Sequence, residues 1–339
     1  FHTLKNKGKK MNSELIIPEG NNKTLAELVG VSVNISGGDT NKQSKSSTLA
    51  RLNLTSKAIM GVKNIEGKDM NLEVIPAGAY ELAQDDGTKV YCINPIIRIL
   101  TFMEQWGRFD VENNKPDRSV MVKGTVFGNV LKDSTGGTNL GRIPNEVCPG
   151  FFDDHWKDRP EDYKKRILDV KRHRLLFGTI DFNGQALDEF GISLKGYKDP
   201  IPFLFDVKNK KSLSEIEIYF NKNEEASADQ LGFSQQEIPR RKAKKARRLE
   251  LEAKCAENLL KSRYTLGSKI HDTGFLWSSV VIEKVEQGDY LDGDIENLIK
   301  FNEWVEWSDN LTLNSWKENN VEQLSDIQAE LVQDFVDVE

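Results

Sequence analysis

The chain has 339 residues, of which 38% are hydrophobic, including 16 phenylalanines and 6 tryptophans. This content supports a packed core and excludes an intrinsically disordered protein. No apolar run approaches the roughly 18–20 residues of a membrane span, so we expect a soluble protein with no membrane partner.

The net charge of −6 is unevenly distributed along the chain. Residues 286–339 contain 15 acidic residues and only two basic ones, which gives this end −13 and leaves +7 for residues 1–285. A basic body attracts phosphates, and an acidic end can compete for the same surface or recruit a basic partner. Two unrelated solvated faces are the alternative explanation.

Cysteine and histidine usage argues against a disulfide framework and against a metal site. The three cysteines, Cys92, Cys148 and Cys255, are far apart and odd in number, which fits a reducing cytoplasm. With four histidines and no Cys-x-x-Cys pair, we expect no metal and no cofactor. The opening residues FHTLKNKGKK are basic and polar, so we expect no signal peptide, and Met11 is a candidate start.

The first two thirds of the chain predict a flexible lead followed by a β-rich core. Residues 1–48 are basic and rich in small polar residues, and we expect a mobile segment there. Residues 49–220 contain successive short apolar runs that predict strands. The Asp-Gly step within Gln84–Thr88 predicts a hairpin, and Pro95 predicts an edge or a bulge.

The last third of the chain is more polar and more helical. Residues 221–264 predict a polar linker and a basic helix, because seven of the nine residues in Arg240–Arg248 are basic. Residues 265–318 predict a strand over Leu266–Ile282, with Phe275 and Trp277 on one side, and then an amphipathic helix over Ile295–Trp307 that packs on the core. Residues 319–339 form an acidic tail.

The segment Pro95–Phe109 suggests a binding face. Read as a strand, it places Arg98, Phe102, Trp106 and Arg108 on one side. Aromatic rings and cations that alternate on one face suit unpaired bases and their phosphates. The alternative is that the rings face a second packed layer and the arginines lie at its rim.

Two further basic segments, one at Lys171–Arg174 and one at Arg240–Arg248, extend this hypothesis. We expect phosphate contacts from Arg98, Arg108, Lys171, Arg172 and Arg174, stacking by Phe102, Trp106 and Phe127, and electrostatic attraction from Arg240, Lys244 and Arg247. No catalytic constellation has specific spacing. Asp169 and Asp181 bracket a predicted strand and are the best candidates for a two-metal site.

The layout resembles the phage-type single-stranded DNA-binding proteins, which combine a β-rich body with an acidic tail that carries an aromatic residue. The closest correspondence lies in the tail residues Asp334, Phe335, Asp337 and Glu339. The resemblance implies an OB-type barrel, non-catalytic binding of single-stranded DNA in replication or recombination, and a tail that gates the groove or recruits partner proteins. Phe335 departs from the pattern because it lies four residues before the end.

Together these observations predict an α+β, β-rich protein with an OB-like barrel core, a basic helical insertion, a C-terminal amphipathic helix and an acidic tail. We expect it to bind single-stranded DNA without strong sequence preference, and the sequence leaves RNA and the oligomeric state open. A virion structural or assembly protein is the first alternative. A nucleic-acid-processing enzyme such as a nuclease is the second.

Overall fold

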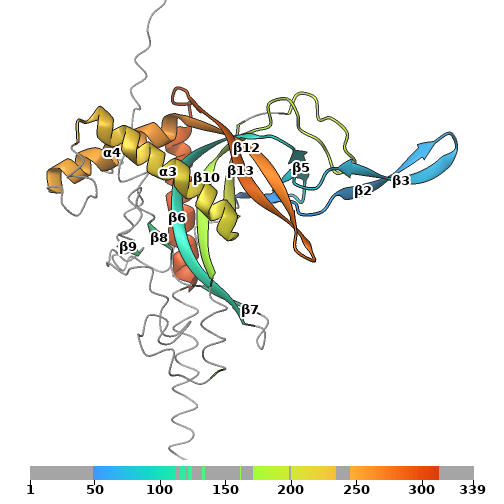
Figure 1. Cartoon of the computed structure of the whole chain (residues 1–339), viewed down its shortest axis with the longest axis horizontal. Coiled ribbons are helices and arrows are strands. Elements are labelled where there is room, and N and C mark those ends of the chain that lie inside the picture. Colours follow the sequence, from blue (N-terminus) through green and yellow to red (C-terminus); the bar gives the residue numbers. More distant parts are fainter. Residues whose placement is uncertain are drawn as a thin grey trace, which may run out of the picture.

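A long curled β-sheet organises the chain in this computed structural model (Figure 1). Eleven strands form the sheet, and eight of them follow one path in the order β13-β12-β6-β10-β11-β1-β4-β5. Helices pack on both faces, so the fold is α+β and strand-rich, as the sequence predicts. The structure describes residues 49–110, 115–118, 121–123, 132–133, 161, 171–197, 200–233 and 245–312.

The strands of the main path come from segments far apart in the sequence. They are β1 (Ala50–Leu54), β4 (Tyr80–Ala83), β5 (Lys89–Cys92), β6 (Ile96–Asp110), β10 (Lys171–Asp181), β11 (Ile201–Val207), β12 (Ser262–Asp272) and β13 (Leu276–Gln287). Three short strands extend the sheet beside β6, namely β7 (Lys115–Arg118), β8 (Val122–Lys123) and β9 (Lys132–Asp133). A separate hairpin of β2 (Ile59–Ile65) and β3 (Lys68–Ile75) projects from the body (Figure 1).

The Asp-Gly hairpin predicted from the sequence is confirmed between β4 and β5, whereas Pro95 lies in the break between two strands. β4 and β5 pair in antiparallel fashion across the Asp-Gly turn, in which Gly87 has a φ of 84° and Thr88 N donates to Asp86. Pro95 separates β5 from β6, and its carbonyl accepts from Leu266 N. Among the described strand pairs, only β1 and β11 run parallel.

A β-bulge in β6 reverses the alternation of its side chains. Thr179 of β10 lies opposite Arg98 and Phe177 lies opposite Thr101, so β6 holds one extra residue between these pairs. Leu176, the residue before Phe177 in β10, lies opposite Phe102. Arg98 and Phe102 therefore lie on opposite faces of the sheet, not on one face as the sequence predicts.

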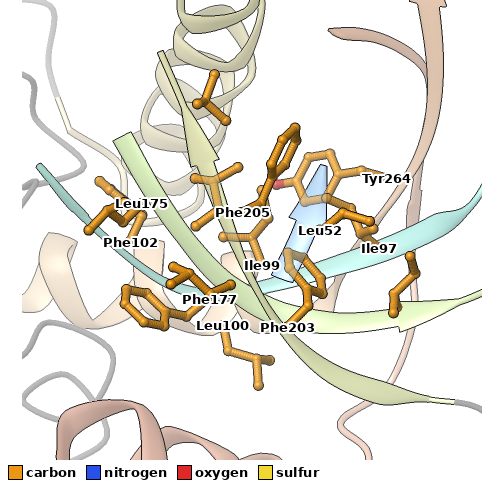
Figure 2. Packing of buried hydrophobic residues seen from close by; sticks show 14 of the residues in the cluster. Leu52, Ile97, Ile99, Leu100, Phe102, Leu175, Phe177, Phe203, Phe205 and Tyr264 are labelled. Atoms are coloured by element: carbon orange, nitrogen blue, oxygen red, sulfur yellow. The ribbon is translucent and has the colours of Figure 1, made fainter. Parts of the chain in front are cut away.

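The main hydrophobic core includes side chains on both faces of the curled sheet, beginning with the inner face (Figure 2). Cross-strand pairing places Leu52, Phe205, Leu176 and Phe102 on this face. The Tyr80 hydroxyl crosses the inside of the curl and donates to the carbonyl of Gly267 at 2.7 Å. Burial raises the pKa of this hydroxyl, so it remains a donor at neutral pH.

A helix over residues 294–312 covers the outer face of the sheet. Leu298, Phe301 and Val305 are fully buried, as predicted from the amphipathic pattern of this segment. The Phe177 ring of β10 lies 5.4 Å from the Phe301 ring and 5.6 Å from the Trp304 ring. This layer buries the centre of β6 on both sides.

The helix α3 (Lys210–Gln230) replaces the end of the predicted β-rich core, and α4 (Lys245–Lys261) packs beside it (Figure 1). Asn209 caps α3 by accepting from Lys211 N, and Leu213, Ile216 and Phe220 form its buried side. The predicted boundary after residue 220 therefore falls inside a helix. None of the described helices is both long and apolar enough to cross a membrane.

The predicted single strand over Leu266–Ile282 is a hairpin. β12 and β13 pair in antiparallel fashion from Ser262 to Gln287. Gly274, with a φ of 92°, forms the turn between them. The turn brings His271 of β12 directly opposite Trp277 of β13.

Candidate nucleic-acid interface

Arg98 does not reach the surface. The residue is 4% exposed, and Nη1 and Nη2 each donate to a carboxylate oxygen of Asp294 at 2.7 Å. Nη2 also donates to the carbonyl of Leu260 at 2.5 Å. The prediction that Arg98 contacts phosphate on an open face is therefore wrong, because the side chain ties β6 to two helices.

Phe102 and Arg174 are also buried, on the opposite face. The Phe102 ring stacks on Phe220 of α3 with 4.4 Å between centroids, and the Arg174 guanidinium lies over both rings. Arg174 forms an ion pair with buried Glu104 and a second one, at 3.4 Å, with Glu217. Both side chains were expected in an open face, and the packing of α3 against the sheet is the reason that they are not.

The other predicted contacts are described only in part. Arg172 lies directly opposite Trp106, and Lys171 lies opposite Gly107. The structure describes the backbone, but not the side chains, of four predicted contact residues: Trp106, Arg108, Lys171 and Arg172. The remaining predicted residues lie outside the described part of the chain: Phe127, Arg240, Lys244, Asp334, Phe335, Asp337 and Glu339.

Arg247, the predicted contact on the basic helix, has structural partners. Its guanidinium lies 4.2 Å from the Phe233 ring, and Nη2 donates to the carbonyl of Leu231 at 3.1 Å. Nη1 forms an ion pair with Glu250. These contacts join the end of α3 to the start of α4, so Arg247 contributes to the helix pair.

An open groove of about 440 Å³ lies where β13 returns toward β1, β11 and the start of α3. We call it the seam groove. It is lined by Arg51, Leu52, Asn53, Leu54, Ser56, Leu204, Phe205, Asp206, Val207, Lys208, Asn209, Ser212, Trp277, Ser278 and Val280. Its walls therefore combine an apolar floor from the core with polar and basic groups at the rim.

Trp277 is the aromatic residue at the rim of the seam groove. The His271 ring stacks on its indole with centroids 4.0 Å apart and an interplanar angle of 22°. The ammonium of Lys211 lies 5.2 Å from the indole centroid and 3.4 Å from His271 Nδ1. The indole N–H donates to the Thr273 hydroxyl at 3.2 Å. The ring is half-buried and held in one orientation.

The electrostatics around Trp277 are basic. Desolvation, and then the charges of Lys211 and Lys269, lower the pKa of His271, which keeps its imidazole neutral at pH 7. Lys208 adds a half-exposed ammonium in the groove wall. In a groove that holds an aromatic ring and several cations, the ring can stack on a base and the cations can attract the adjacent phosphate.

Asp206 is the one acidic residue among the described residues that line the seam groove. Burial alone would raise the pKa of this carboxyl, but the hydrogen bond and charge of His173, 3.0 Å away, and then Lys208, 3.4 Å away, lower its pKa overall. The Lys208 ammonium therefore offsets part of its negative charge within the wall. Among the described residues, no group of three or more His, Cys, Asp and Glu side chains could hold a metal ion.

The sequence singles out Trp277 without assigning it a role. In the sequence, Trp277 follows the turn glycine Gly274, and Lys211, in the first turn of α3, lies 66 positions earlier. Only the curl of the sheet brings these two residues together.

No protein-family model, no curated protein and no solved structure matches the chain.

Proposed function

We propose that the chain is a non-catalytic protein that binds single-stranded DNA through the seam groove during replication or recombination. The observation that carries the proposal is Trp277, an indole that lines an open groove, with the Lys211 ammonium 5.2 Å from its centroid and Lys208 in the lining of the same groove. A base would stack on the indole, and the lysines would attract the adjacent phosphates. The residues differ from those expected from the sequence, but the chemistry is the same.

We further propose that the curled sheet is a variant of the OB-like barrel. The supporting features are its strong curl, its mostly antiparallel pairing and, among the described strands, one parallel pair between β1 and β11. An OB-type barrel usually binds its ligand on one face of its strands, together with the adjoining loops. We infer that the seam groove corresponds to this surface, since residues of β1, β11 and β13 all line it.

The test is a titration of labelled oligothymidylate at several salt concentrations. We expect tighter binding to the single strand than to a duplex of the same length. We also expect log K to fall with log salt, with a slope near −0.7 for each phosphate contact. Equal affinity at low and high salt would contradict the proposal. A parallel titration with oligouridylate separates a DNA preference from general single-strand binding.

A virion or assembly function is the second candidate, and the β2–β3 hairpin favours it. Met60, Val62 and Met70 on this hairpin are 51%, 71% and 47% exposed. Apolar side chains on a projecting hairpin suit contact with another protein. Concentration-dependent assembly in sedimentation experiments, together with absence of oligonucleotide binding, would favour this function over the first.

A further inference from the structure

The edge of β13 is covered by side chains of α3. Val280 N donates to the hydroxyl of Ser212 at 2.8 Å, and Ile282 N donates to Glu215 at 3.3 Å. The Tyr219 hydroxyl donates to the carbonyl of Ile282 at 3.1 Å. The helix thus replaces the missing neighbouring strand over this part of the edge.

Ser278 is the next residue of β13 whose backbone faces this edge. Because N–H groups of alternate residues in an antiparallel strand point the same way, Ser278 N points toward the seam groove, as Val280 N points toward α3. The helix begins at Lys210, and among the described residues no side chain of α3 accepts from Ser278 as Ser212 does from Val280 N. The Ser278 hydroxyl is also buried, with the residue 8% exposed, and has no hydrogen-bond partner among the described residues.

The start of α3 forms the other side of the same space. Asn209 and Ser212 line the seam groove, and the Asn209 side chain accepts from Lys211 N. The helical pattern leaves the N–H groups of Lys210 and Ser212 without an acceptor inside the helix. The N-terminus of this 21-residue helix therefore presents donors and a partial positive charge.

We propose that Ser278 and the N-terminus of α3 form a phosphate site in the seam groove. The donors are Ser278 N–H, the Ser278 hydroxyl and the first N–H groups of α3, with the Lys208 ammonium nearby. Asp206 is the one acidic residue in the described lining, and its ion pair with Lys208 at 3.4 Å offsets part of the repulsion between its carboxylate and an anion. The site rests on the proposed function: it holds the phosphodiester adjacent to the base that stacks on Trp277.

The first test compares two variants that each remove an unpartnered buried hydroxyl. Ser278→Ala changes the proposed site, and Thr179→Val changes a hydroxyl that lies away from the groove, beside Arg98. Loss of an unpartnered hydroxyl should leave the unfolding midpoint of both variants unchanged or slightly higher. We expect Ser278→Ala to weaken oligothymidylate binding about tenfold and Thr179→Val to leave it unchanged. Equal affinities for the two variants would overturn the site.

The second test follows the backbone amide signals of Lys210, Ser212 and Ser278 by NMR. The probes are inorganic phosphate, thymidine monophosphate and oligothymidylate. Shifts with the oligonucleotide alone identify the phosphodiester as the ligand, whereas shifts with all three identify a general phosphate site. Absence of shifts with every probe overturns the site.

With Trp277→Ala added to the binding titration, the two tests also separate this site from the proposed function. If Trp277→Ala weakens oligonucleotide binding but Ser278→Ala does not, the phosphate site is wrong and the function stands. If the wild-type protein binds no oligonucleotide but the three amides respond to phosphate, the function is wrong and the site stands for a free phosphate.

Discussion

Arg98 and Asp294, 196 positions apart in the sequence, form a bidentate ion pair inside the protein. Their side chains are 5% and 1% exposed. Arg98 also bonds the carbonyl of Leu260 at the end of α4, and Asp294 accepts from Leu291 N. One guanidinium therefore fixes β6 against α4 and against the helix over residues 294–312.

Removing one partner of this pair should destabilise the fold strongly. Asp294→Ala leaves the Arg98 guanidinium buried and uncompensated, and we expect a loss of about 3–5 kcal/mol in the free energy of unfolding. Urea denaturation measures it. Glu286→Gln is the control, because it removes the partner of exposed Lys284 and should change stability by less than about 1 kcal/mol. Similar losses for the two variants would contradict this role.

Arg247 allows a test between a structural and an electrostatic role. Arg247→Ala removes the contacts with Phe233 and Leu231, and we expect it to lower the free energy of unfolding by about 1 kcal/mol. Arg247→Lys keeps the charge but loses the planar fork, so it should restore little of that stability. Oligonucleotide affinity should be the same for both variants. A loss of affinity in Arg247→Ala that Arg247→Lys restores would instead support direct attraction of phosphate.

Local signals in the sequence were sufficient for much of the fold. The Asp-Gly step determines the β4–β5 turn because Gly87 adopts a positive φ, and the spacing of Leu298, Phe301 and Val305 determines a buried helical side. The segment Ser212–Phe220 is harder to assign from the sequence, because Leu213, Ile216 and Phe220 have helical spacing but lie beside several residues that favour strands. There the cap at Asn209 determines the outcome.

The predicted binding face failed for a reason that alternation cannot reveal. One extra residue near Leu100 moves Arg98 and Phe102 to opposite faces, and a bulge has no reliable sequence signal when its residues are all apolar. The seam groove depends on contacts between segments far apart, such as Ser212 with Val280, 68 positions later. Such contacts follow from the curl of the whole sheet.

The Asp206–His173 pair predicts a pH dependence of stability. The net effect of its partners lowers the pKa of Asp206 in the folded protein. Its stabilising contribution should therefore be present above the unfolded value of about 3.9 and be lost as pH falls through the lower folded value. We expect Asp206→Asn to be less stable than wild type by about 1 kcal/mol at pH 7, with the difference shrinking in acid. A pH-independent difference would exclude this carboxyl as the cause.

Truncation tests whether the acidic end gates the groove. Residues 321–339 contain only acidic charges and lie outside the described residues. If they compete with DNA for the basic groove, their deletion should tighten oligonucleotide binding, most clearly at low salt, where the charges are least screened. The measurement is the same salt titration with the full chain as the control. Unchanged affinity would exclude gating and leave recruitment of a partner protein as the role of this segment.

Trp277 gives the most direct test of the binding surface. Stacking contributes about 1–3 kcal/mol per base, so Trp277→Ala should weaken oligothymidylate binding roughly five- to 150-fold at fixed salt. Trp277→Phe should retain part of the affinity, because a smaller ring still stacks. Phe190→Ala is a matched control, since Phe190 is 60% exposed and does not line the seam groove. If both alanine variants bind like wild type while remaining folded, the base does not stack on this indole and the DNA must lie elsewhere.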